Sequence, residues 1–252
     1  MSDPRTCLVT GASRGIGAAV AARLSADGHR VALLGRDTLA LGEVCGRLPG
    51  EGRTLVADVT DPAQVEAAIG EVERWWGPVE VLVSNAGAGL GAPLVETSDE
   101  DWARMLELNL TAPFRLVRRV LPGMVAAGWG RIVVVASVVA KRGEAQVAAY
   151  TAAKHGVLGL VRAAAAEVGK TGVTVNAVCP GYVDTPMTDT TVDTIATRTG
   201  RTPEEARALL ARRQPIGRLI DPEEVAEAVA FCVVNGAVTG QGINVDGGTV
   251  QS

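Results

Sequence analysis

The chain has 252 residues, and its 24 basic and 28 acidic side chains give a formal net charge of −4. Hydrophobic residues make up 47% of the sequence and aromatic residues only 3%, so a large core must be built from aliphatic side chains. No apolar run approaches the roughly 20 residues of a membrane-spanning helix, and no basic cluster offers a nucleic-acid site. These features exclude an integral membrane protein and favour small-molecule chemistry without nucleic acid or membrane.

Short apolar runs rich in β-branched residues alternate with segments of helical periodicity along the whole chain. Each run is predicted to be a strand buried on both faces: residues 7–10, 31–34, 54–57, 79–83, 132–136, 173–178 and 243–245. Capping residues mark helix starts at Asp61, Ser98 and Asp221. The alternation predicts a single α/β domain over residues 1–252, a doubly wound (Rossmann) parallel sheet of about seven strands with helices on both faces.

A Thr-rich insertion interrupts this alternation near residues 183–213, before the last predicted helix. It carries its own capping signature, Thr202 followed by Pro203 and Glu205. Because ligands of such sheets bind at the carboxyl ends of the strands, an insertion at this edge is typical of a lid over a substrate. The alternative is a surface excursion that packs on a neighbouring subunit.

The first predicted strand leads into a glycine-rich turn that opens an Ala-rich helix. Such a turn lets the backbone approach a pyrophosphate, which then lies at the positive end of the helix. The spacing GxxxGxG differs from the usual GxGxxG, and the position after the first strand supports a dinucleotide site. Its predicted cofactor-binding residues are Gly11, Ser13, Arg14, Gly15, Ile16 and Gly17.

The end of the second strand decides which dinucleotide is favoured. A carboxylate there would bind the free ribose of NAD(H), and a cation would bind the 2′-phosphate of NADP(H). Arg36 follows Gly35 at this point, and Arg14 could add a second guanidinium. NADP(H) is therefore favoured over NAD(H). In the alternative, Asp37 is the ribose acid, or it caps the next helix while Arg36 is a solvated charge.

Ser137, Tyr150 and Lys154 form a second constellation. Tyr150 and Lys154 stand four residues apart, which in a helix puts them on one face. A nearby ammonium is expected to lower the tyrosine pKa and make the phenol a proton donor for a carbonyl oxygen near neutral pH. Ser137 could hold the same oxygen, and Asn109 could fix Lys154 through water or backbone. The spacing alone is also typical of ordinary surface pairs.

Together these motifs resemble the short-chain dehydrogenase/reductase family from about residue 6 to residue 248. One departure is Ser84, where the family usually has asparagine. The resemblance implies that Tyr150 is the acid, Lys154 its pKa tuner and a ribose ligand, Ser137 the orienting group and Asn109 the relay anchor. It also implies that the cofactor contacts Asp58, Val59, Asn85, Ala86, Gly87, Pro180, Gly181, Val183 and Thr185.

Residues 177–187 and 215–218, with the insertion between them, resemble β-ketoacyl and polyketide ketoreductases, which reduce a 3-oxo group on a carrier-tethered chain. The implied function is NADPH-dependent reduction of a ketone to a secondary alcohol. The alternatives are an NAD-dependent 3-hydroxybutyrate-like dehydrogenase and, from another class, a non-catalytic dinucleotide sensor. Arg115, Arg118 and Arg119 could contact an acidic acyl carrier protein, although the solvated cationic face of a helix is the commoner explanation.

The family resemblance further implies a homotetramer or homodimer, and small side chains along residues 148–168 could let a second helix pack closely. The N-terminus lacks the pattern of a signal peptide, so a cytoplasmic location is expected. No group of His, Cys and Asp residues has the spacing of metal ligands, and the four scattered cysteines are expected to be free thiols.

Overall fold

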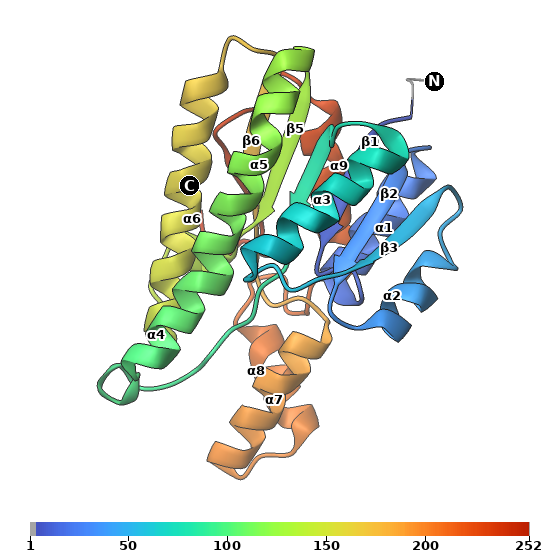
Figure 1. The fold of residues 1–252 in the computed structure, drawn as a ribbon. Coiled ribbons are helices and arrows are strands. Elements are labelled where there is room, and N and C mark those ends of the chain that lie inside the picture. Colours follow the sequence, from blue (N-terminus) through green and yellow to red (C-terminus); the bar gives the residue numbers. More distant parts are fainter. Residues whose placement is uncertain (1–3, 252) are drawn as a thin grey trace.

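The computed structural model describes residues 4–251 and contains a seven-stranded, fully parallel sheet in the order β3-β2-β1-β4-β5-β6-β7 (Figure 1). Its strands are β1 (Thr6–Thr10), β2 (Arg30–Gly35), β3 (Gly52–Val56), β4 (Val81–Ser84), β5 (Gly130–Val135), β6 (Val173–Pro180) and β7 (Gly242–Val245). The predicted fold is confirmed, and each strand lies where an apolar run predicted it. The strand order reverses between β1 and β4, which in such sheets opens a ligand crevice at the carboxyl ends.

The prediction that every strand is buried on both faces holds for the central strands and is wrong at the two edges. All residues of β1, β4, β5 and β6 are buried. In β3, however, only Leu55 is buried, and each residue of β7 is half-buried. Edge strands have a neighbour on one side only, so their side chains are less enclosed.

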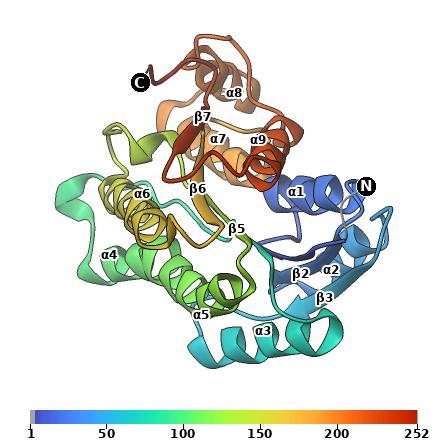
Figure 2. The same ribbon diagram turned by 90° about the horizontal axis from the view of Figure 1, so that it is seen from above.

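Helices cover both faces of the sheet in separate layers (Figure 2). They are α1 (Gly15–Ala26), α2 (Thr38–Cys45), α3 (Pro62–Trp76), α4 (Asp99–Leu106), α5 (Ala112–Ala127), α6 (Ala148–Val168) and α9 (Pro222–Val234). On one face, α3, α5 and α6 contribute to a core cluster that includes Leu8, Ile69 and Ile132. On the other face, α1, α2 and α9 pack around Val20, Val31 and related side chains.

The predicted caps start the helices as expected. The Asp61 carboxylate accepts hydrogen bonds from the backbone N–H groups of Ala63 and Gln64, at 2.9 and 3.1 Å. The Ser98 hydroxyl accepts from the Asp101 N–H at 3.1 Å. Each cap satisfies donors that have no partner inside the helix.

The insertion at residues 183–213, called the lid from here on, folds into two helices, α7 (Pro186–Thr199) and α8 (Pro203–Arg212). They project beyond the sheet on the side where β6 ends (Figure 1). Thr202 and Glu205 form the predicted capping box at the start of α8. The lid has its own small core of Val192, Ala206 and Leu210, so the two helices form one packed unit.

Within residues 4–251, no helix combines the length and apolar character needed to cross a bilayer. The same residues contain no group of three or more His, Cys, Asp or Glu side chains that could hold a metal ion. All four cysteines are free thiols, as expected, and only Cys45 is not fully buried.

Candidate active site

The glycine turn after β1 is held in shape by its contacts. Gly11 has a φ of 65°, in the left-handed region that favours glycine. A Cβ on Gly17 would lie 2.6 Å from Nδ2 of Asn85 and would overlap the Gly11 carbonyl. The sequence therefore needs glycine at both positions, and the turn lies directly before the N-terminus of α1.

The segment after β4 is tied to this turn by hydrogen bonds. The Asn85 side-chain amide donates to the carbonyls of Thr10 and Gly11, at 2.9 and 3.2 Å. The Thr10 hydroxyl accepts from the backbone N–H groups of Asn85 and Ala86, each at 3.0 Å. Asn85 thus braces the glycine turn with its side chain, and the role of Asn85 and its neighbours in contacting cofactor stays a prediction.

The turns that carry the predicted cofactor residues all follow a strand at its carboxyl end. They comprise residues 11–17 after β1, Arg36 after β2, Asp58 and Val59 after β3, residues 85–87 after β4, and Pro180, Gly181, Val183 and Thr185 at the end of β6 and beyond. The β1 and β6 turns face each other closely, because a Cβ on Gly15 would lie 3.0 Å from Cγ2 of Thr185.

The charged groups at the end of β2 bear on whether Arg36 binds the phosphate of NADP(H) or Asp37 binds the ribose of NAD(H). Asp37 is the N-cap of α2, and its carboxylate accepts a hydrogen bond from the Ala40 N–H at 3.1 Å. The Arg36 side chain is 80% exposed, and its Nη1 lies 3.5 Å from the Asp58 carboxylate. Hydrogen bonds from Thr60, and more weakly the Arg36 guanidinium, lower the pKa of Asp58. Asp37 is therefore engaged in capping, whereas Arg36 is available to an anionic ligand.

Tyr150 and Lys154 lie in the first turns of α6, and Ser137 follows β5. The Lys154 ammonium is buried, donates a hydrogen bond to the Val135 carbonyl at 3.0 Å, and lies 5.5 Å from the centroid of the Tyr150 ring. Ser137 also caps the short helical turn Val138–Ala140 by accepting from the Val139 N–H at 3.3 Å. The structure thus brings the ammonium and the phenol ring together, as the spacing predicted.

The expected lowering of the Tyr150 pKa is not found. Burial raises the pKa of Tyr150 to about 12, and an interaction with the Ser137 hydroxyl opposes this rise only in part. Burial also lowers the pKa of Lys154 to about 8. The prediction was wrong because the spacing gives proximity but not desolvation, which disfavours both charged forms. The raised value keeps the phenol protonated at neutral pH, as a proton donor requires.

Asn109 lies in a π-helical turn, Glu107–Thr111, between α4 and α5. Its side chain is fully buried, and Nδ2 donates to the carbonyls of Ala88 and Met105, at 3.0 and 3.1 Å. Its Oδ1 is buried without a hydrogen-bond partner. A Cβ on Gly87 would lie 2.9 Å from this oxygen and 3.6 Å from the Lys154 Nζ. Asn109 therefore points an unsatisfied acceptor toward the region of the buried ammonium.

Comparison with known proteins identifies the family. The family model described as enoyl-(acyl carrier protein) reductase matches residues 11–250. The 3-oxoacyl-(acyl-carrier-protein) reductase FabG of Vibrio cholerae serotype O1 is 39% identical over 248 residues, covering 98% of this chain and 97% of that protein. The chain belongs to the short-chain dehydrogenase/reductase family.

Solved structures agree with this short-chain dehydrogenase/reductase assignment. A crystal structure of an actinorhodin polyketide ketoreductase variant with NADPH is 41% identical and superimposes with a TM-score of 0.93, covering 98% of this chain and 97% of that chain. Levodione reductase is 32% identical with a TM-score of 0.92, covering 97% and 96% of the two chains. The resemblance carried by the sequence motifs is thereby confirmed.

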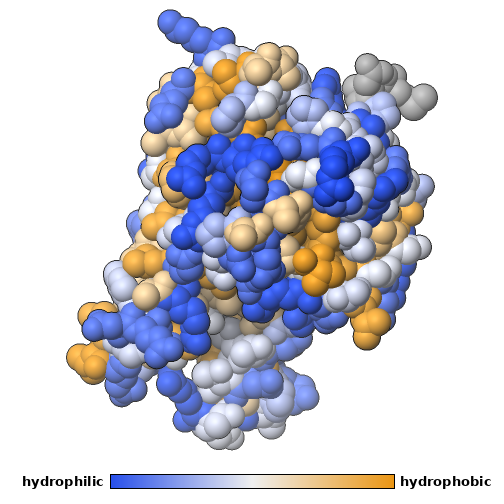
Figure 3. Space-filling model, in the orientation of Figure 1, coloured by the Kyte–Doolittle hydropathy of each residue, from blue (hydrophilic) through white to orange (hydrophobic). Residues whose placement is uncertain are grey.

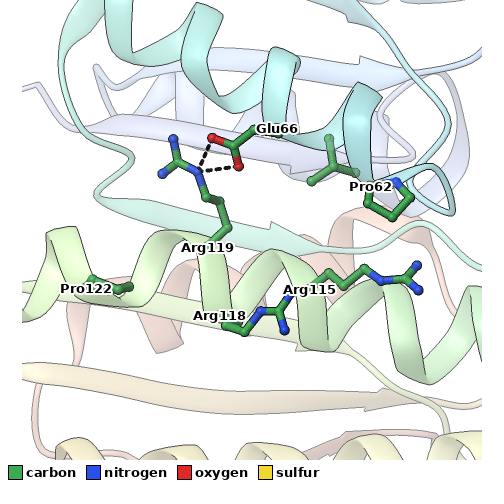
Figure 4. A pocket seen from close by; sticks show the side chains of 7 residues that line it. Pro62, Glu66, Arg115, Arg118, Arg119 and Pro122 are labelled. Carbon is green, nitrogen blue, oxygen red and sulfur yellow. Dashed lines mark hydrogen bonds and ion pairs between the residues drawn. The ribbon is translucent and has the colours of Figure 1, made fainter.

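The three arginines of α5 that could contact a carrier protein line one surface pocket with Pro62 and Glu66 of α3, and Figure 4 shows Arg119 bonded to Glu66. Arg119 bonds two glutamates of α3, and Arg115 pairs with Glu107. Arg118 stacks its guanidinium over the Phe114 ring, with 5.0 Å to the centroid, and forms no ion pair within the described residues. Two of the three arginines thus serve the fold, which favours the solvated helix face over a carrier-protein site.

Sequence reasoning missed Gln214, a buried side chain that joins the lid to the end of β6. Its Oε1 accepts from the Tyr182 N–H at 2.9 Å, and its Nε2 donates to the carbonyls of Tyr182 and Arg218, at 3.1 and 2.6 Å. A Cβ on Gly181 would overlap the Gln214 amide. The only sequence signal was a glutamine before Pro215, which does not indicate burial.

Proposed function

We propose that the protein is an NADPH-dependent ketoreductase that reduces a ketone to a secondary alcohol. The observation that carries the proposal is the buried Lys154 ammonium 5.5 Å from the Tyr150 ring, at the edge of the sheet where the glycine turn also lies. Family membership and the names of the full-length relatives support it.

The residues around the glycine turn fit a dinucleotide. Gly11, Gly15 and Gly17 fit a tight turn, because a Cβ on any of them would come within 3.0 Å of other protein atoms. The N-terminus of α1 has no acidic residue in its first turn. The exposed Arg36 suits the 2′-phosphate of NADPH, because a guanidinium binds phosphate with two parallel hydrogen bonds. The capping role of Asp37 argues against its use as a ribose acid for NAD.

The protein's own residues would handle the proton and orient the substrate. NADPH, when bound, supplies the hydride that is added to the carbonyl carbon. In the proposal, Tyr150 donates its phenolic proton to the carbonyl oxygen, so the product is the neutral alcohol. Ser137 donates a hydrogen bond to the same oxygen and holds it in line.

Lys154 and Asn109 would support the tyrosine. The buried Lys154 ammonium stabilises negative charge that develops on the phenol oxygen as its proton leaves. The unsatisfied Oδ1 of Asn109 suits a water that in turn hydrogen-bonds Lys154, since buried waters occur where buried polar atoms have no protein partner. Such a water would connect the tyrosine to a path for reprotonation.

The most suitable substrate class is a 3-oxoacyl or polyketide β-keto group on a carrier. The family description names an enoyl reductase, but the full-length relatives are named for 3-oxoacyl and polyketide ketone reduction, and we base the substrate on those names. An acyl carrier protein is the corresponding partner. A homotetramer or homodimer is proposed on family grounds.

One experiment tests the proposal directly. Purified protein is assayed for NADPH and NADH oxidation with β-keto thioesters, cyclic ketones and acetoacetate. We expect NADPH oxidation with the β-keto thioesters and much slower oxidation of NADH. A protein that binds NADPH but reduces none of these ketones would be the dinucleotide sensor instead. Equal rates with both coenzymes would contradict the role given to Arg36.

A further inference from the structure

Gln146 has the only positive φ of any non-glycine residue within residues 4–251, at 66°. It lies in the loop that joins Ser137 to Tyr150, four residues before the tyrosine. A side chain in this left-handed region is strained, and such strain persists only where surrounding contacts determine the backbone. The contacts of Gln146 should therefore show what the strained conformation serves.

The backbone and the side chain of Gln146 bind two different segments. Its carbonyl accepts a hydrogen bond from the Ala92 N–H at 2.7 Å, and the next residue, Val147, forms a parallel bridge with Ala92. Its side-chain Oε1 accepts from Nη1 of Arg198 on α7 at 2.9 Å. Gln146 thus joins the loop before α6, the segment after β4 and the lid.

The lid is attached to the rest of the protein at both of its ends. The Asp184 N–H donates to the Ile220 carbonyl at 2.8 Å, and Arg213 contacts the Tyr182 hydroxyl at 3.2 Å. Tyr182 and Leu219 pack against the lid's small apolar core, and the face seen in Figure 3 is largely white and blue over the projecting helices. A second tie runs from Arg213, just after α8, to Glu144 at 3.3 Å, in the same loop as Gln146. Arg198 and Arg213 thus tie the lid to the loop before Tyr150, and the loss of such polar ties favours local opening.

We propose that Gln146 is a positioning residue that latches α7 to the loop before Tyr150 and thereby sets the affinity for the ketone. The inference rests on the proposed function for its kinetic consequence only. The left-handed backbone of Gln146 directs its carbonyl to Ala92 while its amide reaches Arg198, so a single residue aligns the lid with the segment that carries Tyr150. Opening the latch would let the lid move away from the bound substrate.

A double-mutant cycle tests the latch. Gln146→Leu removes the acceptor, Arg198→Met removes the donor, and the double variant removes both. Hydrogen exchange of residues 186–199 should become about three- to tenfold faster than in the wild type in each single variant. The double variant should exchange no faster than the single variants, because the same interaction is lost in all three. Arg201→Met is the matched control, since Arg201 is exposed and has no ion pair within the described residues.

Kinetics provide the second measurement. In each single variant the KM for a β-keto thioester should rise by about the same factor as the exchange rate, while kcat and the Kd for NADPH change less than about twofold. Gln146→Glu keeps an acceptor for Arg198 and should restore the wild-type KM and exchange rate.

Unchanged exchange in the Arg198→Met variant, or additive effects in the double variant, would overturn the latch. Failure of Gln146→Glu to restore exchange would do so as well. If the wild-type protein reduces no ketone, the proposed function fails, but hydrogen exchange still decides whether Gln146 holds the lid. The Arg198→Met variant leaves the strained backbone of Gln146 untouched, so the test does not depend on how position 146 tolerates substitution.

Discussion

Replacing Lys154 with methionine should stabilise the protein at neutral pH while it removes the activity. The Lys154 side chain is 4% exposed, and burial lowers its pKa from 10.5 to about 8. Methionine has a similar length and no charge, so the Lys154→Met variant keeps the packing of α6 and loses the cost of burying an ammonium. This substitution separates the energetic cost of burying the Lys154 ammonium from its proposed role in the reaction.

The magnitude follows from the pKa difference. A folded-state pKa of about 8 against 10.5 corresponds to about 3 kcal/mol of destabilisation wherever both states are protonated, which is below about pH 8. The lost hydrogen bond to the Val135 carbonyl offsets about 1 kcal/mol of this. We expect the Lys154→Met variant to be more stable than the wild type by about 2 kcal/mol at pH 7.

The sign of the pH dependence is fixed by proton counting. Between about pH 8 and 10.5 the unfolded state keeps the Lys154 proton and the native state releases it, so wild-type stability rises with pH relative to the variant. Below about pH 8 this contribution is constant, at its least favourable value. The raised pKa values of Tyr150, Cys7 and Cys232 are common to both proteins and cancel in the difference. The pKa of Cys179 does not cancel fully, because the Lys154 charge opposes its rise.

Urea unfolding followed by tryptophan fluorescence, at fixed protein concentration and ionic strength from pH 7 to pH 10, measures this difference. Lys170→Met is the control, because Lys170 is exposed at the end of α6. Its curve should run parallel to that of the wild type. Parallel curves for wild type and Lys154→Met, or a variant less stable at pH 7, would refute the claim that Lys154 is buried at an energetic cost.

Three further substitutions test other parts of the site. Tyr150→Phe should lower kcat by about 10² to 10⁴ while the Kd for NADPH, from fluorescence titration, changes less than about twofold, and retained turnover would reject the proposed acid. Arg36→Ala should raise the KM for NADPH about tenfold or more and leave NADH unaffected in steady-state assays, and a parallel loss for both would reject phosphate recognition. Gly17→Ala should abolish dinucleotide binding and lower the midpoint of thermal unfolding, because its Cβ would overlap the Gly11 carbonyl.

The fold was predictable because its signals are local. A parallel sheet buries its central strands on both faces, so runs such as residues 132–136 and 173–178 identify β5 and β6 directly. The caps at Asp61 and Thr202 each accept a hydrogen bond from an N–H group three residues later, so the capping pattern can be recognised in a short stretch of sequence. Strand order is not local, and the low burial of β3 and β7 follows from their edge positions.

The proximity of Tyr150 and Lys154 could be predicted from the sequence, but the pKa values of the two groups could not. The helical spacing correctly brought Lys154 to the Tyr150 ring, but the pKa of each group depends on burial by segments distant in sequence. The same reason explains the arginines of α5: Arg119 pairs with a glutamate 46 positions away, which no local pattern indicates. Asp37 stayed ambiguous until the structure gave its hydrogen bond to the Ala40 N–H.

Some strain and unsatisfied polar atoms occur beside the residues proposed for the reaction. Within the described residues, buried side-chain atoms without partners include Asn109 Oδ1, Arg142 Nε and Thr151 Oγ1, while others lie on β2, β6 and β7. Gln146, with its left-handed backbone, lies between Arg142 and Thr151. Each such group costs stability unless water or ligand completes it. Of these atoms, Asn109 Oδ1 lies close to the buried Lys154 ammonium, and an unsatisfied acceptor there suits a bound water or ligand, because packing alone would favour an apolar side chain at this position.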